Sequence, residues 1–268
     1  MPIKHDESGK RWVEMDLVVP GTPEEVWRAL ATGPGYTAWF TPADIEERVG
    51  GTLRFDLGPY GVSVGEVTTW QPPERFGYIE REWSAGAPPV ATEITIVARS
   101  GGRCVVRMVH SLFTSSDAWD DQVEGFEGGW PGFFEVLRLY LTHYAGRKAA
   151  AFMAMTGVPA DQPAVWQRLT NALHLEGANV GDRRAAPADT PGLAGVVEHV
   201  RQDGKQRLLV MRLDAPSPGV ALIGTYGMAD RTNASVCLFL YGDHADATAA
   251  SIKPRWESWL RDTLAPSA

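Results

Sequence analysis

Large aromatic side chains are the residues of this sequence best suited to bind another molecule. The 268-residue chain contains ten tryptophans, nine phenylalanines and seven tyrosines. Aromatic rings fill protein cores, but they also line apolar ligand pockets. The alternative for each ring is an ordinary core position. We expect a ligand-binding cavity in the first half of the chain, lined by Trp39, Phe40, Phe55, Tyr60, Trp70, Trp83, Phe113, Trp130, Phe133 and Phe134.

One histidine of the first half is a candidate for proton transfer. His110 lies near the end of the strand-like run 103–113. A histidine changes charge near neutral pH, which suits it to act as a proton shuttle. The alternative is a hydrogen-bonded core histidine. Because the sequence shows no Ser-His-Asp order, phosphate loop or dinucleotide fingerprint, the catalytic residues, if there are any, stay unknown.

A second polar candidate comes from the run 76–83, which alternates like a strand. Alternation places Tyr78 and Glu80 on one face, and Arg81 and Trp83 on the other. If the face of Arg81 lined the cavity, its guanidinium would anchor a carbonyl or carboxylate of the ligand. The alternative is a solvated surface arginine.

The sequence favours no metal and no organic cofactor. His174, His199 and His244 fall in different predicted elements, without the spacing of metal ligands. The two cysteines, Cys104 and Cys237, lie in separate apolar runs, which is typical of buried free thiols in a reducing compartment.

Composition excludes several classes of protein. The formal net charge of −8 is unfavourable for binding nucleic-acid phosphates. The chain is 44% hydrophobic and 22% charged, as in soluble globular proteins. The polar N-terminus lacks a signal sequence, and no apolar run is long enough to span a bilayer. We therefore expect a cytoplasmic protein that binds no nucleic acid and does not insert into membranes.

Periodicity predicts mixed helices and strands in the first half. Thr22, Pro23 and Glu25 carry the signals of a helix start, and a second short helical segment follows at 36–40. Gly128 and Gly129 predict a tight turn before a long helix that runs to about residue 150. No helix separates the central strands, so the sheet should be antiparallel. The predicted strands are 12–20, 51–57, 62–70, 76–83, 90–98 and 103–113.

The second half repeats the first in shortened form. VPGTPEEVWRAL (19–30) aligns without a gap with VPADQPAVWQRL (158–169), and later strand pairs and a final helix, 252–264, follow in the same order. A Pro- and Ala-rich connection, 185–192, stands where the first half has its strand 51–57. We therefore predict two domains, residues 1–150 and a shortened second copy, residues 151–268.

The first half resembles the SRPBCC, or START/Bet v-like, superfamily, in particular its branch related to the activator of the heat-shock ATPase. The resemblance rests on TPEEVWRALATGPGYTAWF, VGG (49–51), GEV (65–67), the strand YIEREW, the strand ending in His110 to Phe113, and the GGW helix. It implies an α+β fold of two tandem helix-grip domains, each a curved antiparallel sheet wrapped around a long C-terminal helix with an apolar cavity between them.

The resemblance leaves two classes of function open. Members of the superfamily bind apolar molecules, act as aromatase/cyclases in polyketide biosynthesis, confer self-resistance on antibiotic producers, or bind protein partners. We expect binding of an apolar, elongated or polycyclic small molecule, in bacterial natural-product biosynthesis or self-resistance, with cyclase activity as an option. The alternative is a protein-interaction module like the heat-shock-ATPase activator domain.

Overall fold

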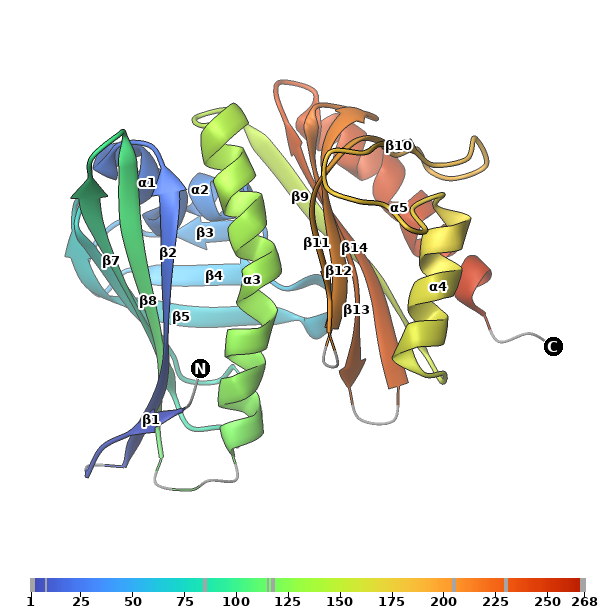
Figure 1. Ribbon diagram of the computed structural model, residues 1–268. Coiled ribbons are helices and arrows are strands. Elements are labelled where there is room, and N and C mark those ends of the chain that lie inside the picture. The colour runs from blue at the N-terminus through green and yellow to red at the C-terminus, as the bar shows by residue number, and fades with distance from the viewer. Residues whose placement is uncertain are drawn as a thin grey trace. The chain divides into compact units, whose positions relative to one another are not determined.

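The computed structural model describes residues 3–7, 9–83, 86–114, 116, 119–203, 206–228 and 231–265. The chain divides into two compact units, Met1–Gly146 and Arg147–Ala268. Each unit contains one antiparallel sheet and a long C-terminal helix (Figure 1). The fold class is therefore α+β, as the sequence predicts.

The first unit is built on an eight-stranded sheet with the order β1-β2-β8-β7-β6-β5-β4-β3. All the predicted strands of this half are present, and β1 and β3 extend the sheet at its two edges. The strands are β1 Lys4–His5, β2 Lys10–Pro20, β3 Ala43–Ile45, β4 Thr52–Asp56, β5 Val62–Gln71, β6 Arg75–Glu80, β7 Val90–Arg99 and β8 Arg103–Phe113.

Local capping starts helix α1 where the sequence predicts. Helix α1, Pro23–Ala31, begins after Thr22, whose side chain accepts a hydrogen bond from the backbone N–H of Glu25 while the Glu25 carboxylate accepts one from the backbone N–H of Thr22. This reciprocal pair satisfies two N–H groups that the helix start would leave unpaired. Helix α2, Gly33–Thr37, begins three residues before the predicted segment 36–40, because the Thr32 side chain caps it by accepting a hydrogen bond from the Gly35 N–H. The 3₁₀ turn Gly58–Tyr60 follows later in the chain.

The long helix of the first unit differs from the sequence prediction. Helix α3 spans Asp120–His143, so it begins before Gly128 and Gly129 and continues through Pro131. The predicted tight turn at the two glycines is wrong, and the helix also ends earlier than residue 150. Glycine and proline only disfavour a helix, and packing of a long apolar side against a sheet overrides that cost. Helix α3 packs against β2 and β8.

The second unit has a six-stranded sheet with the order β10-β11-β12-β13-β14-β9, two strands fewer than the first. Helices α4, Gln162–Ala172, and α5, Ala245–Leu264, pack on this sheet, α5 mainly against β9 and β14. The strands are β9 Ala149–Val158, β10 Arg183–Ala185, β11 Ala194–Gln202, β12 Gln206–Ala215, β13 Gly219–Met228 and β14 Arg231–Tyr241.

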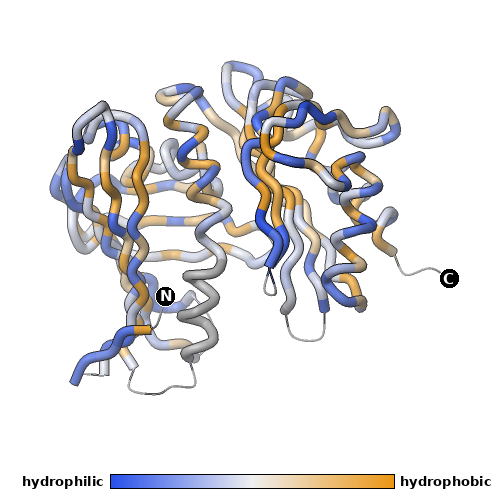
Figure 2. Tube along the Cα trace, in the orientation of Figure 1, coloured by the Kyte–Doolittle hydropathy of each residue, from blue (hydrophilic) through white to orange (hydrophobic). Residues whose placement is uncertain are grey.

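Hydropathy is unevenly distributed between the two sheets. In the first sheet, buried and exposed residues alternate along β4, β7 and β8, so one face is apolar and the other meets solvent. In β14 every residue from Thr232 to Tyr241 is buried. The central strands of the second sheet are accordingly apolar over much of their length (Figure 2).

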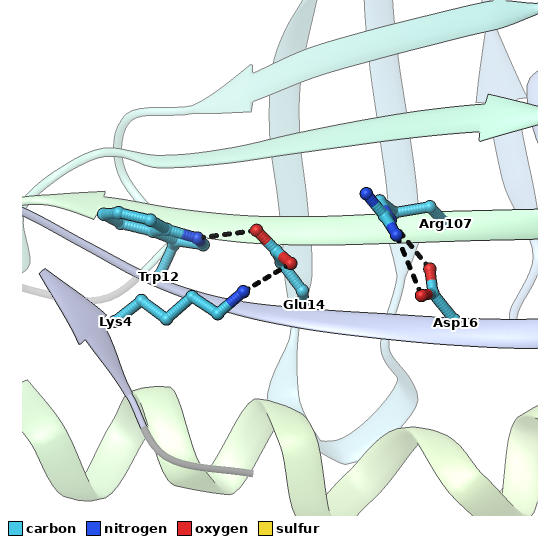
Figure 3. A network of polar contacts seen from close by, with 5 residues as sticks. All are labelled: Lys4, Trp12, Glu14, Asp16 and Arg107. Atoms are coloured by element: carbon cyan, nitrogen blue, oxygen red, sulfur yellow. Dashed lines mark hydrogen bonds and ion pairs between the residues drawn. The ribbon is translucent and has the colours of Figure 1, made fainter.

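The solvent face of the first sheet carries a polar network (Figure 3). Arg107 on β8 donates two hydrogen bonds to Asp16 on β2, at 2.8 and 3.0 Å. Glu14 accepts hydrogen bonds from Lys4, at 2.6 Å, and from the indole of Trp12, at 3.0 Å. Lys4, Asp16 and Arg107 are exposed and Trp12 and Glu14 are half-buried, so the ion pairs of the network contribute little to stability. It identifies this face of the sheet as the outer one.

No helix within the described part of the chain is long and apolar enough to cross a membrane. In the same residues, no three His, Cys, Asp or Glu side chains gather closely enough to hold a metal ion.

Candidate ligand-binding site

The inner face of the first sheet, opposite the network of Figure 3, holds a cluster of aromatic rings. Six of the ten predicted ligand-binding residues belong to it: Trp39 and Phe40 after α2, Phe55 on β4, and Trp130, Phe133 and Phe134 on α3. Tyr36 and Tyr78 complete the cluster, which we call the aromatic cluster.

Several rings of the aromatic cluster lie nearly parallel. Trp130 stacks on His110, with ring centroids 5.3 Å apart, and on Phe134 at 5.6 Å. Trp39 stacks on Phe134 and on Tyr36, at 6.5 and 5.4 Å. Stacked and offset rings attract each other beyond their buried area, so these contacts hold the rings of the cluster in fixed orientations.

The aromatic cluster is not sealed from solvent. Trp39 and Tyr36 are fully buried, whereas Phe40, Phe133 and Phe134 are only partly buried. Part of the apolar surface of the cluster is therefore in contact with solvent.

The other four predicted ligand-binding residues have different ring neighbours or are exposed. Trp70 packs against Trp27 and Phe76, at centroid distances of 5.0 and 5.6 Å. Phe76 in turn lies 5.5 Å from the ring of Tyr78, so Trp70 is joined to the aromatic cluster through Phe76. Trp83 pairs with Trp119 at 6.1 Å. Tyr60 and Phe113 are 46% and 51% exposed.

The placement of Arg81 does not support its predicted role. Strand β6 ends at Glu80, and Arg81 lies in the bend that follows, exposed, with its guanidinium 3.8 Å from the carboxylate of Glu66. Within β6, Phe76 and Tyr78 are buried, so their face is the inner one. The alternation of the sequence was right, but the face of Tyr78 and Glu80, and not that of Arg81, points inward.

A line of polar side chains crosses the inner face beneath the aromatic rings. Tyr78, Thr92 and His110 are directly opposite one another on β6, β7 and β8, and all three are buried. Directly opposite residues of neighbouring strands share a face and contact each other. Thr92 Oγ1 and His110 Nδ1 form a hydrogen bond of 2.9 Å, in which the donor depends on the histidine tautomer.

Glu80 extends this line at the β5 side. Ser63 on β5 is buried and donates a hydrogen bond from its hydroxyl to the Glu80 carboxylate. Directly opposite Glu80 stands Gly65, where a Cβ would lie 2.8 Å from the Ile79 carbonyl oxygen and 3.1 Å from Glu80 Cγ. A glycine is therefore required for the carboxyl side chain to lie over β5. We call Ser63, Tyr78, Glu80, Thr92 and His110 the polar row.

Burial controls the charge of the polar row. It lowers the pKa of His110 to about 4, so the imidazole is neutral at pH 7. Burial raises the pKa of Glu80, an effect that the hydrogen bond from Ser63 partly offsets. Burial also raises the pKa of the Tyr36 and Tyr78 hydroxyls, and the nearby negative charge of Glu80 adds to this effect. The row therefore presents neutral hydroxyls, a neutral imidazole and one carboxyl group.

Sequence reasoning identified His110 but missed Ser63, Glu80 and Thr92. The signal that would have revealed Glu80 is the alternation Phe76, Tyr78, Glu80, because two aromatics on one face of a strand favour that face as the buried one. Thr92 and Ser63 have no such signal. Their places follow from strand pairing between residues far apart in the chain.

A comparison with protein-family models finds one match within the first unit. The family described as "Activator of Hsp90 ATPase homolog 1-like protein" matches residues 20–142. This range runs from the end of β2 to the last turn of α3, so it includes the aromatic cluster and the polar row. A search among curated proteins finds no match.

Solved structures similar to the chain cover either about half of it or nearly all of it. Protein MLL2253 from Mesorhizobium loti is 25% identical, with a TM-score of 0.45 over 50% of this chain and 98% of that one. DynU16, from the dynemicin biosynthetic locus, is 16% identical, with a TM-score of 0.44 over 93% and 95% of the two chains. The di-domain ARO/CYC BexL, from the BE-7585A biosynthetic pathway, is 13% identical, with a TM-score of 0.44 over 96% and 100%.

Proposed function

We propose that the first unit binds an apolar small molecule between its sheet and helix α3. The proposal starts from the match of residues 20–142 to the Activator of Hsp90 ATPase homolog 1-like family. The molecule is flat, and elongated or polycyclic. Its rings stack on the aromatic cluster, and its polar atoms meet the polar row.

The observation that carries this proposal is the polar row itself. Burying polar groups costs free energy unless their hydrogen bonds are replaced, so a core built only for stability would hold aliphatic side chains there. Instead, three neighbouring strands place Tyr78, Thr92 and His110 side by side, and the ring of Trp130 stacks on His110. Such a surface combines stacking area with a few fixed polar groups, which is typical of small-molecule sites.

The setting that we propose is bacterial natural-product biosynthesis or self-resistance, as the superfamily resemblance of the first half implies. A cyclase-type reaction would use His110, which is neutral at pH 7 and therefore able to accept a proton, though only as a weak base. Binding without chemistry needs only the aromatic cluster and the polar row.

Native mass spectrometry of the freshly purified protein tests the proposal. We expect a co-purified small molecule, or one-to-one adducts when the protein is incubated with 2-naphthol or a larger polycyclic phenol. Trp130→Ala removes the ring that stacks on His110 and should weaken the adduct at least tenfold. Absence of any adduct, in a protein whose circular dichroism shows the native fold, would contradict small-molecule binding.

A second candidate function is protein interaction, and exposed valines on the outer face of the first sheet favour it. Val18 on β2 and Val97 on β7 are 46% and 60% exposed, and both pair with Val105 on β8. This short apolar strip is small for a stable interface. Val18→Lys and Val97→Lys should abolish such an interaction without affecting adducts with 2-naphthol.

A further inference from the structure

We propose that Glu80 is the specificity-determining residue of the first unit: its carboxyl group selects apolar ligands that carry a hydrogen-bond donor, either a hydroxyl or an ammonium group. The inference rests on the proposed function, because it concerns the ligand that the same interior binds. In this proposal, the polar end of the ligand lies at the part of the inner face formed by β5 and β6, near Ser63, Tyr36 and Tyr78.

The first argument is the position of the carboxyl group. Glu80 shares the inner face with Tyr78, and Ser63 donates a hydrogen bond to one of its oxygens. The hydroxyls of Tyr36 and Tyr78 lie close enough to Glu80 for its negative charge to raise their pKa. A carboxylate accepts hydrogen bonds on two oxygens with several lone pairs, so acceptor sites remain beyond the one that Ser63 uses.

The second argument is that no cation neutralises this carboxyl group. Among the described residues, no Lys, Arg or His forms an ion pair with Glu80. Arg81, the next residue, turns outward to Glu66. Arg11, which shares the inner face with Val13, stands at the far end of the cross-strand row Glu80, Val90, Leu112 and Arg11. Three strand spacings separate the two ends, roughly 14 Å. Burial without a counterion is what raises the pKa of Glu80.

The third argument is that the Glu80 side chain is partly exposed and that no side chain on the opposite strand occupies its space. Glu80 is only partly buried by its neighbours, as are Phe40, Phe133 and Phe134. Gly65, directly opposite, leaves the space that the Glu80 side chain needs. Burying this carboxyl group costs free energy, no cation compensates that cost, and one side of the group stays accessible. The carboxyl group therefore contributes to ligand binding and not to the stability of the fold.

A series of four naphthalene probes of similar size tests the inference in the full-length protein. These are 2-naphthol, 2-methylnaphthalene, 2-naphthylmethylamine and 2-naphthoate, and their dissociation constants are measured at pH 7 by quenching of tryptophan fluorescence. In a purely apolar site the methyl probe would bind more tightly than the hydroxyl probe, because the hydroxyl loses its hydration. We expect the reverse, with 2-naphthol or the amine binding about tenfold more tightly than 2-methylnaphthalene, as one hydrogen bond to a charged acceptor provides. Which of the two donor probes binds best distinguishes a hydroxyl from an ammonium ligand.

Glu80→Gln is the matched variant, and Glu93→Gln, an exposed carboxyl on β7, is its control. Glu80→Gln should reduce the affinity advantage of 2-naphthol and the amine over 2-methylnaphthalene severalfold, because the amide keeps one acceptor oxygen but loses the charge, while the thermal midpoint stays unchanged or rises. Glu93→Gln should keep the wild-type ranking. If all probes bind but 2-naphthol and the amine gain nothing over 2-methylnaphthalene, or if 2-naphthoate binds best, the role of Glu80 is refuted and ligand binding stands. If no probe binds the folded wild-type protein, the proposed function fails, and this inference with it.

Discussion

At the scale of single residues, burial drives the two acid–base groups of the polar row toward their uncharged forms. The pKa of His110 falls to about 4, and the pKa of Glu80 rises above its usual value of 4.5. Both shifts have desolvation as their largest cause, because a charge is less stable in the interior than in water. Each shift therefore links the stability of the first unit to pH, and the two act in opposite directions.

We expect the stability that His110 contributes to be lost on acidification. The unfolded chain binds a proton at its ordinary pKa of 6.5, whereas the folded protein does so only near 4. Between these values the unfolded state holds more protons, so the free energy of unfolding falls as the pH drops from 6.5 toward 4. That interval corresponds to about 3 kcal/mol. His110→Gln cannot titrate, so the difference between wild type and variant should shrink by up to that amount.

Urea unfolding at several pH values between 4 and 7.5 measures this difference. The contribution of Glu80 is common to both proteins and cancels. His5→Gln changes an exposed histidine and serves as control, with an unfolding curve that follows the wild type at each pH. A difference between wild type and His110→Gln that stays constant with pH would show that His110 titrates normally and is not buried.

At the scale of elements, local signals predicted some boundaries and failed at others. The start of α1 could be predicted because Thr22 and Glu25 complete their capping contacts within four residues. The start of α3 could not, since Gly128, Gly129 and Pro131 are locally unfavourable to a helix and only packing against the sheet outweighs them. Glycine and proline signals are therefore reliable at chain turns and misleading inside a packed helix.

The candidate site shows the same division. Trp39, Phe134 and Trp130 could be predicted because large rings must be buried somewhere, and the resemblance placed them near one interior. The polar row could not, because its register joins Tyr78, Thr92 and His110 through pairings across 14 and 18 residues of sequence. A sequence pattern gives the two faces of a strand, but not which strand lies beside it or which face is covered.

The course of helix α3 makes a direct prediction about Gly129. This residue lies inside the helix, is exposed, and a Cβ built on it would have no atom within 4 Å. Alanine is favoured over glycine in a helix interior by about 0.5–1 kcal/mol. Gly129→Ala should therefore stabilise the protein by about that amount in urea unfolding. Gly65→Ala, with a Cβ 2.8 Å from the Ile79 carbonyl oxygen, should do the opposite. A destabilised Gly129→Ala would instead favour the turn that the sequence alone suggested.

At the scale of the whole molecule, the two units share an order of elements but differ in their interiors. The first sheet aligns Tyr78, Thr92, His110 and Val13 across four strands. The corresponding strands of the second sheet align Leu209, Ile223, Val236 and Ala154, which are all buried and apolar. The second interior is thus filled mostly by aliphatic side chains, together with Phe152, Trp166 and Trp256, as in a core that serves stability.

This difference predicts one ligand per chain, although the chain contains two related units. Calorimetric titration with 2-naphthol should give a stoichiometry near one, because the first interior aligns three hydrogen-bonding side chains where the second, among the described residues, aligns apolar ones. Two tryptophans, each on the long C-terminal helix of its unit, provide matched variants: Trp130 on α3 and Trp256 on α5. Trp130→Leu should abolish most of the binding heat. Trp256→Leu should leave a cavity in an apolar core and cost about 2–4 kcal/mol of stability, yet keep one site of unchanged affinity.

A stoichiometry of two, or loss of binding in Trp256→Leu at a temperature where the variant is folded, would show that the second unit binds ligand as well. Both related units would then contain a binding site, and the apolar row Leu209, Ile223, Val236 and Ala154 would not prevent binding.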